Sequence, residues 1–370
     1  MVDRVADHRQ VVHDRKAGRG REALHGAGSR HPVPLTKRTS RRGRTVMAKA
    51  IKNIKAFMPF AVNDALYKWC ARAVKNSDAA LEAVKNFLDR DPGDHEWSHL
   101  GLAAVMPGET AIVHDLDGAG YLFMYRWAER KLPASVRDEE LKKRYDALVE
   151  KEGRALNKKE FAQLRDDVET ALLPKAFIVP KVIPLIVTRK RLFVCTSSAT
   201  MCEKILTHLM RLCETRKVEL NWSDLATHVS PASMLTRIVR EGGVYLDDSG
   251  ESGLGAGKSG VFKGDNKNVV RIKDRDLSHT EFDELRNSGT YNVTELSLTY
   301  NADDMVVSTF TLNDKLVFKG IKLGDAVGTG IDTADLHATY WLFAKEIDRM
   351  LDAVMAVYMD GQDAPADDEL

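Results

Sequence analysis

Three segments of alternating apolar residues follow one another near the C-terminal end of the chain, joined by very short turns. They cover residues 291–300, 305–312 and 316–323, with "NADD" and "ND" as the connecting turns. A period of two residues with turns this short predicts strands paired as hairpins. Because hairpin partners run in opposite directions, these residues are expected to form an antiparallel meander.

A second hairpin and several helices accompany these strands. Residues 180–196 contain two apolar runs, "VIPLIVT" and "LFVCT", on either side of the basic turn "RKR". Helical patterns cover residues 136–173, 199–214, 231–241 and 335–359. Because the strands and helices occur in separate groups, mostly with hairpin links, the pattern favours an α+β fold with antiparallel sheets and flanking helices over a doubly wound parallel sheet.

Capping signals predict where three helices begin. Asn157 stands three residues before Glu160, and Ser278 stands three residues before Glu281. Ser230 directly precedes a proline, and a glycine follows that helix. A side-chain oxygen at such a position can accept a hydrogen bond from a free N–H of the first turn. We therefore expect helices to begin just after Asn157, Ser230 and Ser278.

Charge is distributed very unevenly along the chain, although its net charge is only +1. Residues 1–46 carry 12 Lys and Arg against 4 Asp and Glu, whereas the rest carries 43 against 50. The first segment shows no apolar period, so we expect it to be disordered. Ordered patterning starts at Met47. We interpret residues 1–46 as a non-native basic leader, and a basic nucleic-acid arm is the alternative. Residues 362–370 read as a disordered acidic tail.

The composition also narrows the class of protein. No window approaches ~18–20 uninterrupted apolar residues, so no transmembrane helix is expected. The four cysteines have no Cys-x-x-Cys spacing, which favours a reduced, cytoplasmic protein over a disulfide framework. They are Cys70, Cys195, Cys202 and Cys213.

The stretch "GESGLGAGKSG", residues 250–260, resembles a nucleotide-binding P-loop. Gly257, Lys258 and Ser259 match the end of the Gly-x-x-x-x-Gly-Lys-Ser/Thr pattern, but Ser252 stands where the first glycine should be. The residues that follow, "VFKGDNKNVV", do not favour the helix that a P-loop must open. We therefore expect a flexible insertion that does not bind a nucleotide.

A second short motif, "HEWSH", matches the His-Glu-x-x-His pattern of zinc hydrolases. On a helix, His95 and His99 would lie one turn apart and could share a zinc ion, with Glu96 activating water. The flanking "DPGD" and "LGL" do not favour a helix running through the motif. A zinc hydrolase or metal-dependent nuclease using these three residues remains the enzymatic alternative.

Basic residues concentrate in one part of the otherwise acidic core. Only Asp265 and Asp274 oppose them between residues 258 and 275. A strand over residues 268–273 would project alternate cations to one side, and such a row can follow a phosphate backbone. A solvated sheet edge guarded by lysines is the alternative. The basic residues are Lys258, Lys263, Lys267, Arg271, Lys273 and Arg275.

Several segments, in order, resemble the family of the recombination-associated protein RdgC. They are "LPASVRDEELKKRYDALVEKEGRALNKKEFAQLRDDVETALLPKAF", "VIPLIVTRKRLFVCTSSAT", "VVRIKDRDLSHTEF" and "HATYWLFAKEIDRMLDAV". The similarity covers about residues 47–361. Two features have no counterpart in the family, namely the leader and the glycine-rich stretch, which lies where the family has a shorter link.

This resemblance implies a fold and a function. The family's α+β protomer has a horseshoe shape and forms a ring-shaped homodimer around double-stranded DNA, which it binds without sequence preference while restraining RecA-promoted strand exchange. Approximate subdomains would be 47–135, 136–225 and 226–361. The resemblance implies no cofactor, no established nuclease site and a cytoplasmic, nucleoid-associated protein. It places the basic strand against DNA, although Asp274 stands where the family tends to have a basic residue. It also places Phe177 at the dimer contact.

Overall fold

The computed structural model describes residues 54–106, 108–247, 250, 252–303, 305–324, 327 and 335–359. The expected leader and acidic tail both lie outside these residues. None of the described helices is long and apolar enough to cross a membrane.

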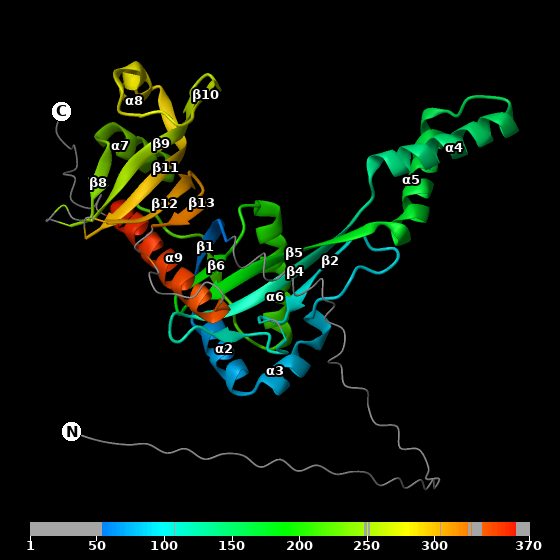
Figure 1. Cartoon of the computed structure of the whole chain (residues 1–370), viewed down its shortest axis with the longest axis horizontal. Helices are drawn as coiled ribbons and strands as arrows, with labels where there is room; N and C mark the ends of the chain where they lie inside the picture. Colours follow the sequence, from blue (N-terminus) through cyan, green and yellow to red (C-terminus); the bar gives the residue numbers. More distant parts are fainter. Residues whose placement is uncertain are drawn as a thin grey trace, which may run out of the picture. The chain divides into compact units, whose positions relative to one another are not determined.

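Helices and strands occur in separate groups along the described chain (Figure 1). The helices and 3-10 turns are α2 (Ala65–Lys75), α3 (Ser77–Ala83), η2 (Lys85–Phe87), α4 (Ala134–Glu152), α5 (Lys158–Leu172), η3 (Leu173–Lys175), α6 (Ala199–Thr215), α7 (Pro231–Glu241), η4 (Thr280–Phe282), α8 (Asp283–Asn287) and α9 (Leu336–Met359). The strands are β1 (Ala56–Val62), β2 (Ser98–Ala103), β3 (His114–Asp115), β4 (Tyr121–Lys131), β5 (Phe177–Val187), β6 (Arg191–Val194), β7 (Trp222–Ser223), β8 (Gly243–Tyr245), β9 (Gly253–Gly264), β10 (Val269–Ile272), β11 (Tyr291–Ala302), β12 (Met305–Asn313) and β13 (Phe318–Leu323).

The strands form one hydrogen-bonded series in which β1 belongs to two sheets. The order is β10-β9-β11-β12-β13-β1-β6-β5-β4-β2, with β3 beside β4, β7 beside β1 and β8 beside β9. The first residues of β1 pair with β13, and residues 58–61 pair with β6. We call β2 to β7 with β1 the first sheet, and β8 to β13 the second sheet. The ladders between the described strands are antiparallel, so the predicted α+β class, the meander and the 180–196 hairpin are confirmed.

The central strands of the first sheet are buried on both faces. On β4, Tyr121, Phe123 and Tyr125 belong to a core shared with α2, α3 and α6. Leu122 and Met124 alternate with them and belong to a second core on the opposite face. A strand covered on both faces loses the alternation of apolar and polar residues, which explains why β4 and β5 read as nearly continuous apolar runs.

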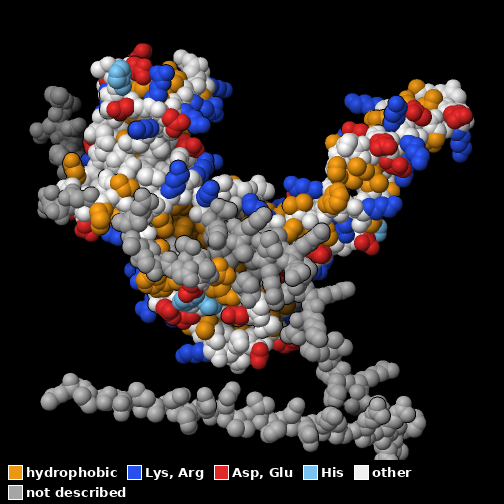
Figure 2. Space-filling view, viewed as in Figure 1, with side chains coloured by type: hydrophobic (Ala, Val, Ile, Leu, Met, Phe, Trp, Pro, Cys, Tyr) orange, Lys and Arg blue, Asp and Glu red, His pale blue; other side chains and the backbone are white. Residues whose placement is uncertain are grey.

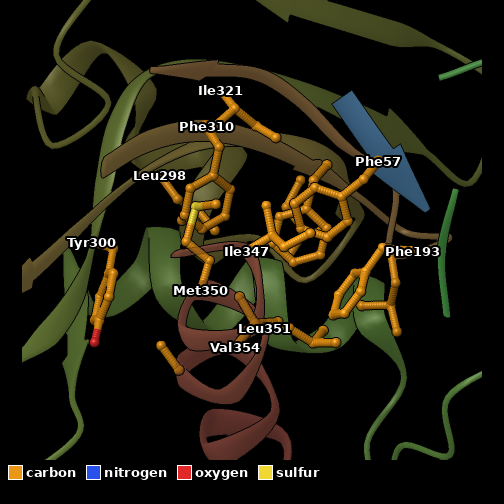
Figure 3. Close-up of a cluster of buried hydrophobic side chains, with 14 of the residues drawn as sticks. Phe57, Phe193, Leu298, Tyr300, Phe310, Ile321, Ile347, Met350, Leu351 and Val354 are labelled. Carbon is orange, nitrogen blue, oxygen red and sulfur yellow. The ribbon is translucent and has the colours of Figure 1, made fainter. Parts of the chain in front are cut away.

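The second core joins the two sheets around α9. Figure 3 shows apolar side chains of this helix gathered with those of the second sheet and with Phe57 and Phe193 of the first. The ring of Phe57 stacks on Phe318 of β13 with the centroids 4.3 Å apart. Each fully buried side chain of this size contributes about 1.5–3 kcal/mol relative to an exposed one. The residues of α9 labelled in the figure are Ile347, Met350, Leu351 and Val354.

Polar contacts also tie α9 to the first sheet. Arg191 of β6 forms an ion pair with Asp348. In the first turn of α9, His337 Nε2 lies 2.9 Å from Asp117 Oδ2, and His337 Nδ1 lies 2.8 Å from His114 Nε2. Burial lowers the pKa of His114. The helix therefore links both sheets, by apolar packing in its middle and by hydrogen bonds at its start.

Two of the predicted helix starts are confirmed. The side chain of Asn157 accepts hydrogen bonds from the N–H groups of Lys159 and Glu160, and the Glu160 carboxylate accepts one from the Asn157 N–H. Ser230 accepts from the N–H of Ser233 at the start of α7. These caps form as expected because they depend only on residues within one turn.

Other local expectations are wrong. The glycine-rich stretch is not a flexible loop from Gly253 onward, because Gly253–Gly264 is strand β9 between β10 and β11. Ser278 does not cap a helix, since the ring of His279 accepts from the Glu281 N–H at the start of η4. Sequence patterns also missed β2, which pairs with β4 along its whole length. β9 and β2 form strands because they pair with distant strands, and their local sequence does not indicate this pairing.

Candidate nucleic-acid interface

Strands β9 and β10 form a hairpin at the edge of the second sheet, and we call residues 257–275 the basic hairpin. Phe262 is fully buried on the inner face of the sheet. Lys263 pairs with Val269, and Val261 pairs with Arg271. Cross-strand partners point to the same face, so Lys263 and Arg271 share the outer face. Figure 2 shows Lys and Arg side chains gathered at this edge.

The Gly-Lys-Ser sequence lies in an irregular part of β9. The register with β11 shifts between Leu296 and Leu298, and the Ser259 N–H donates to Ser297 Oγ at 2.9 Å. A Cβ atom on Gly257 would lie 2.5 Å from the same oxygen, so the close approach of the two strands requires glycine here. No helix follows this stretch, so the strand-to-helix geometry of a P-loop is not formed. Lys258 is instead an exposed side chain on a strand.

The cations of the basic hairpin are exposed and mostly without partners. Among the described residues, only Arg275 of the six forms an ion pair, with Glu281 at 3.2 Å. The other five form no side-chain hydrogen bond or ion pair within that part of the chain. Five cations therefore make no direct contact with a carboxylate there, although Lys258 lies near enough to Asp276 to help the hydrogen bonds from Ser278 lower the pKa of that carboxyl. They are Lys258, Lys263, Lys267, Arg271 and Lys273, all exposed.

The expected single row of alternating cations is wrong beyond Ile272. Strand β10 ends at that residue, and Asp274 has a left-handed backbone with φ of 55°. The chain then turns so that the Arg275 N–H donates to the Lys258 carbonyl at 2.9 Å. Lys273 and Arg275 therefore do not continue the row that Arg271 begins on the strand face.

Phe177 lies far from these residues in the sequence, at the first position of β5. Its side chain is 70% exposed, and Val179, two residues along the same face, is 44% exposed. Large apolar groups exposed in this way mark contact surfaces when they adjoin one another. The role of Phe177 in a dimer contact stays a prediction.

The "HEWSH" segment is not a helix. His95 lies in a turn, and His99 lies in β2. The Glu96 carboxylate accepts hydrogen bonds from both Nη atoms of Arg90, at 2.6 and 2.8 Å, and from the Gly93 N–H. These bonds lower the pKa of Glu96 to about 2. The zinc-hydrolase interpretation needs both histidines on one helical face, so in that form it is wrong.

In the described ranges, no three His, Cys, Asp or Glu side chains lie where they could hold a metal ion together. The four cysteines are free thiols.

A polar hollow of about 530 Å³ opens beside the basic hairpin. It lies between the start of α7, the turn that joins β9 to β10, and the start of β11. Lys263 and Lys267 line it together with Ser230, Ser233 and Asn292. Sequence reasoning found the two lysines but missed the others, because they come from distant segments and carry no charge.

Comparison with known proteins places the whole arrangement in a family. A family model described as "Putative exonuclease, RdgC" matches residues 62–360. A protein of Colwellia psychrerythraea named "Recombination-associated protein RdgC" is 27% identical over 277 residues, covering 72% of this chain and 85% of the relative. Proteins with the same name from Psychromonas ingrahamii and Pseudomonas syringae pv. syringae are 25% and 30% identical, covering 81% and 66% of this chain and 98% and 78% of theirs. This chain belongs to the RdgC family of recombination-associated proteins.

Proposed function

We propose that this chain binds double-stranded DNA without sequence preference as a ring-shaped homodimer, and that it thereby restrains RecA-dependent homologous recombination. It would act in the cytoplasm, on the nucleoid. The observation that carries the DNA-binding part is the set of five exposed cations on the basic hairpin that form no ion pair among the described residues.

Phosphate contacts explain why such a surface would ignore sequence. Lysine and arginine bind the phosphate groups that every duplex carries, so affinity depends on released counterions and not on base edges. No aromatic residue lies between the cations of residues 257–275 apart from Phe262, which is buried. Stacking on unpaired bases is therefore not favoured, and a duplex is the better-fitting partner.

The test is fluorescence anisotropy with two duplexes of equal length and unrelated sequence, over a range of salt concentrations. We expect similar affinities and a linear fall of log K with log salt, with a slope of about −0.9 for each phosphate contact. Affinity that ignores salt, or that differs strongly between the duplexes, would contradict the phosphate mechanism.

The homodimer rests on the family resemblance and on the exposed surface at Phe177. Sedimentation of Phe177→Asp should show a shift from dimer to monomer, because a charge replaces an apolar contact. Tyr245→Asp is the matched control, since Tyr245 is also an exposed aromatic residue, at 72%. An unchanged dimer in Phe177→Asp would place the interface elsewhere.

Two further assays distinguish this proposal from a DNA-coating role and from a nuclease activity. A RecA strand-exchange assay should show inhibition by the wild-type protein, and its absence would leave only a DNA-coating role. End-labelled duplex incubated with Mg²⁺, Mn²⁺ or Zn²⁺ should remain intact. Cleavage by the pure protein that is lost in Glu96→Ala would instead establish the enzymatic alternative.

A further inference from the structure

The hollow beside the basic hairpin has walls from three separate parts of the second sheet and its helix. Lys263 and Lys267 come from the end of β9 and the following turn, Asn292 from β11, and Ser230 and Ser233 from the start of α7. The turn is held in place, because the Gly264 N–H donates to the Asn268 carbonyl at 2.8 Å. The turn that carries Lys267 is therefore fixed by a backbone hydrogen bond.

Several groups in these walls have hydrogen-bonding capacity to spare. The side chains of Lys263, Lys267 and Asn292 make no hydrogen bond or ion pair with any other described residue. Ser230 Oγ and Ser233 Oγ lie 2.8 Å apart, and only one hydroxyl hydrogen can lie between them, so the other remains available. The first turn of α7 is already capped by Ser230, so the donors here are side chains and not the end of the helix.

The charge of the hollow favours one kind of anion. The charged residues that line it are Lys263, Lys267 and Asp265, two cations and one anion. A singly charged oxyanion would neutralise this set, whereas a dianion would leave a net negative charge. A phosphodiester carries one negative charge, and a phosphate monoester at neutral pH carries nearly two.

The hollow is also continuous with the surface proposed to face DNA. Lys263 belongs to the same outer face of the hairpin as Arg271, as a diagonal neighbour across the β9–β10 ladder. Diagonal neighbours lie about 7–8 Å apart, so both can contact one strand of a nucleic acid.

We propose that this hollow seats one phosphodiester group of the bound DNA strand, held by Lys263 and Lys267 together with Asn292. The inference rests on the proposed function. It adds one specific phosphate position to a surface otherwise described only by its charge. At this position neutral hydrogen-bond donors bind the phosphate together with the cations.

A double-mutant cycle measured by DNA anisotropy tests it. Lys267→Asn removes the charge and keeps a residue that tolerates the left-handed backbone at this position, where φ is 62°. We expect Lys267→Asn and Asn292→Ala each to weaken binding about 3- to 10-fold, and only the lysine variant to reduce the salt slope, by about 0.9. Because both groups would hold one phosphate, their effects should deviate from additivity by about 3-fold or more.

Lys273→Ala with Asn292→Ala is the matched control pair, since Lys273 does not line the hollow. Those two effects should be additive. Additive effects for Lys267 and Asn292, in variants whose unfolding curves match the wild type, would overturn the proposal while leaving DNA binding intact. If the wild type itself showed no salt-dependent binding to DNA, that result would instead contradict the proposed function.

Inorganic phosphate distinguishes the source of the anion. Calorimetric titration of the wild type with phosphate should give at most weak, millimolar binding. Submillimolar phosphate binding that disappears in Lys267→Asn, with DNA affinity unchanged in that variant, would show a site for free phosphate and refute the phosphodiester seat.

Discussion

The helical hairpin of α4 and α5 and the basic hairpin of β9 and β10 differ in how far their charged side chains are paired. Residues 134–172, which form α4 and α5, carry 9 Lys and Arg against 10 Asp and Glu, and their arginines all form ion pairs. The basic hairpin carries 6 against 2, and five of its cations form no ion pair in the described part of the chain. Balanced charges stabilise exposed helices modestly, whereas an excess of one sign creates a field that attracts a polyanion.

The largest expected effect follows from removing that excess. Replacing the five cations without partners by glutamine should weaken duplex binding by about 10²–10³-fold near 0.1 M salt and make the salt slope shallower by about 4–5. Anisotropy at four or more salt concentrations measures both. The variant changes Lys258, Lys263, Lys267, Arg271 and Lys273.

The helical hairpin supplies the control for this experiment. It has five lysines, as many as the cations replaced in the basic hairpin, but carboxylates surround them. Their replacement by glutamine should therefore change the affinity for duplex DNA by less than about 3-fold. An equal loss from both sets would mean that net charge, and not the placement of the basic hairpin, governs binding. The control variant changes Lys142, Lys143, Lys151, Lys158 and Lys159.

A glycine in each hairpin gives a smaller, structural contrast. Gly257→Val should destabilise the protein by about 1–3 kcal/mol, because its side chain must displace Ser297 and the neighbouring backbone. Gly153→Ala, at the left-handed end of α4 with open space around it, should cost only about 1 kcal/mol of backbone strain. Urea unfolding measures both. A smaller loss for Gly257→Val would show that β9 and β11 can separate there at little cost.

The smallest expected effect concerns pH. The hydrogen bonds from Arg154 to Glu160 lower the pKa of that carboxyl to about 2, from 4.5. Its folded-state pKa lies below the unfolded value, so its contribution to stability is present above about pH 4.5 and is lost as pH falls toward 2. The stability difference between wild type and Glu160→Gln should therefore shrink from pH 6 to pH 3.

Lys273→Gln is the comparison for the pH experiment. Lys273 forms no ion pair with a carboxylate among the described residues, so protonation of carboxylates removes no such contact from it. Its difference from wild type should be the same at pH 6 and pH 3. A constant difference for Glu160→Gln as well would mean that the ion pair contributes nothing in solution.

Much of the fold could be predicted from short-range patterns, and the candidate site only in part. The cap at Asn157, the start of α7 at Ser230 and the 291–323 meander were correct because neighbouring residues determine them. The concentration of six cations in residues 257–275 is visible in the sequence alone. Which of them form an ion pair could not be predicted, since Arg275 reaches Glu281 only after the chain turns at Asp274.

The stretch Gly250–Gly260 shows most clearly where local sequence stops being informative. By itself, the sequence determined that this stretch lacks the spacing of a P-loop, because that motif is a matter of fixed local positions. Only the tertiary structure decided that its glycines from Gly253 onward lie in a strand. Glycine has little strand preference of its own, but β9 runs so close to β11 and β8 that a Cβ atom at Gly257 or Gly253 would collide with Ser297 or the Val244 carbonyl. The same pairing brings Lys263 to the wall of a hollow shared with Asn292 and Ser230, residues that only the folded chain places together.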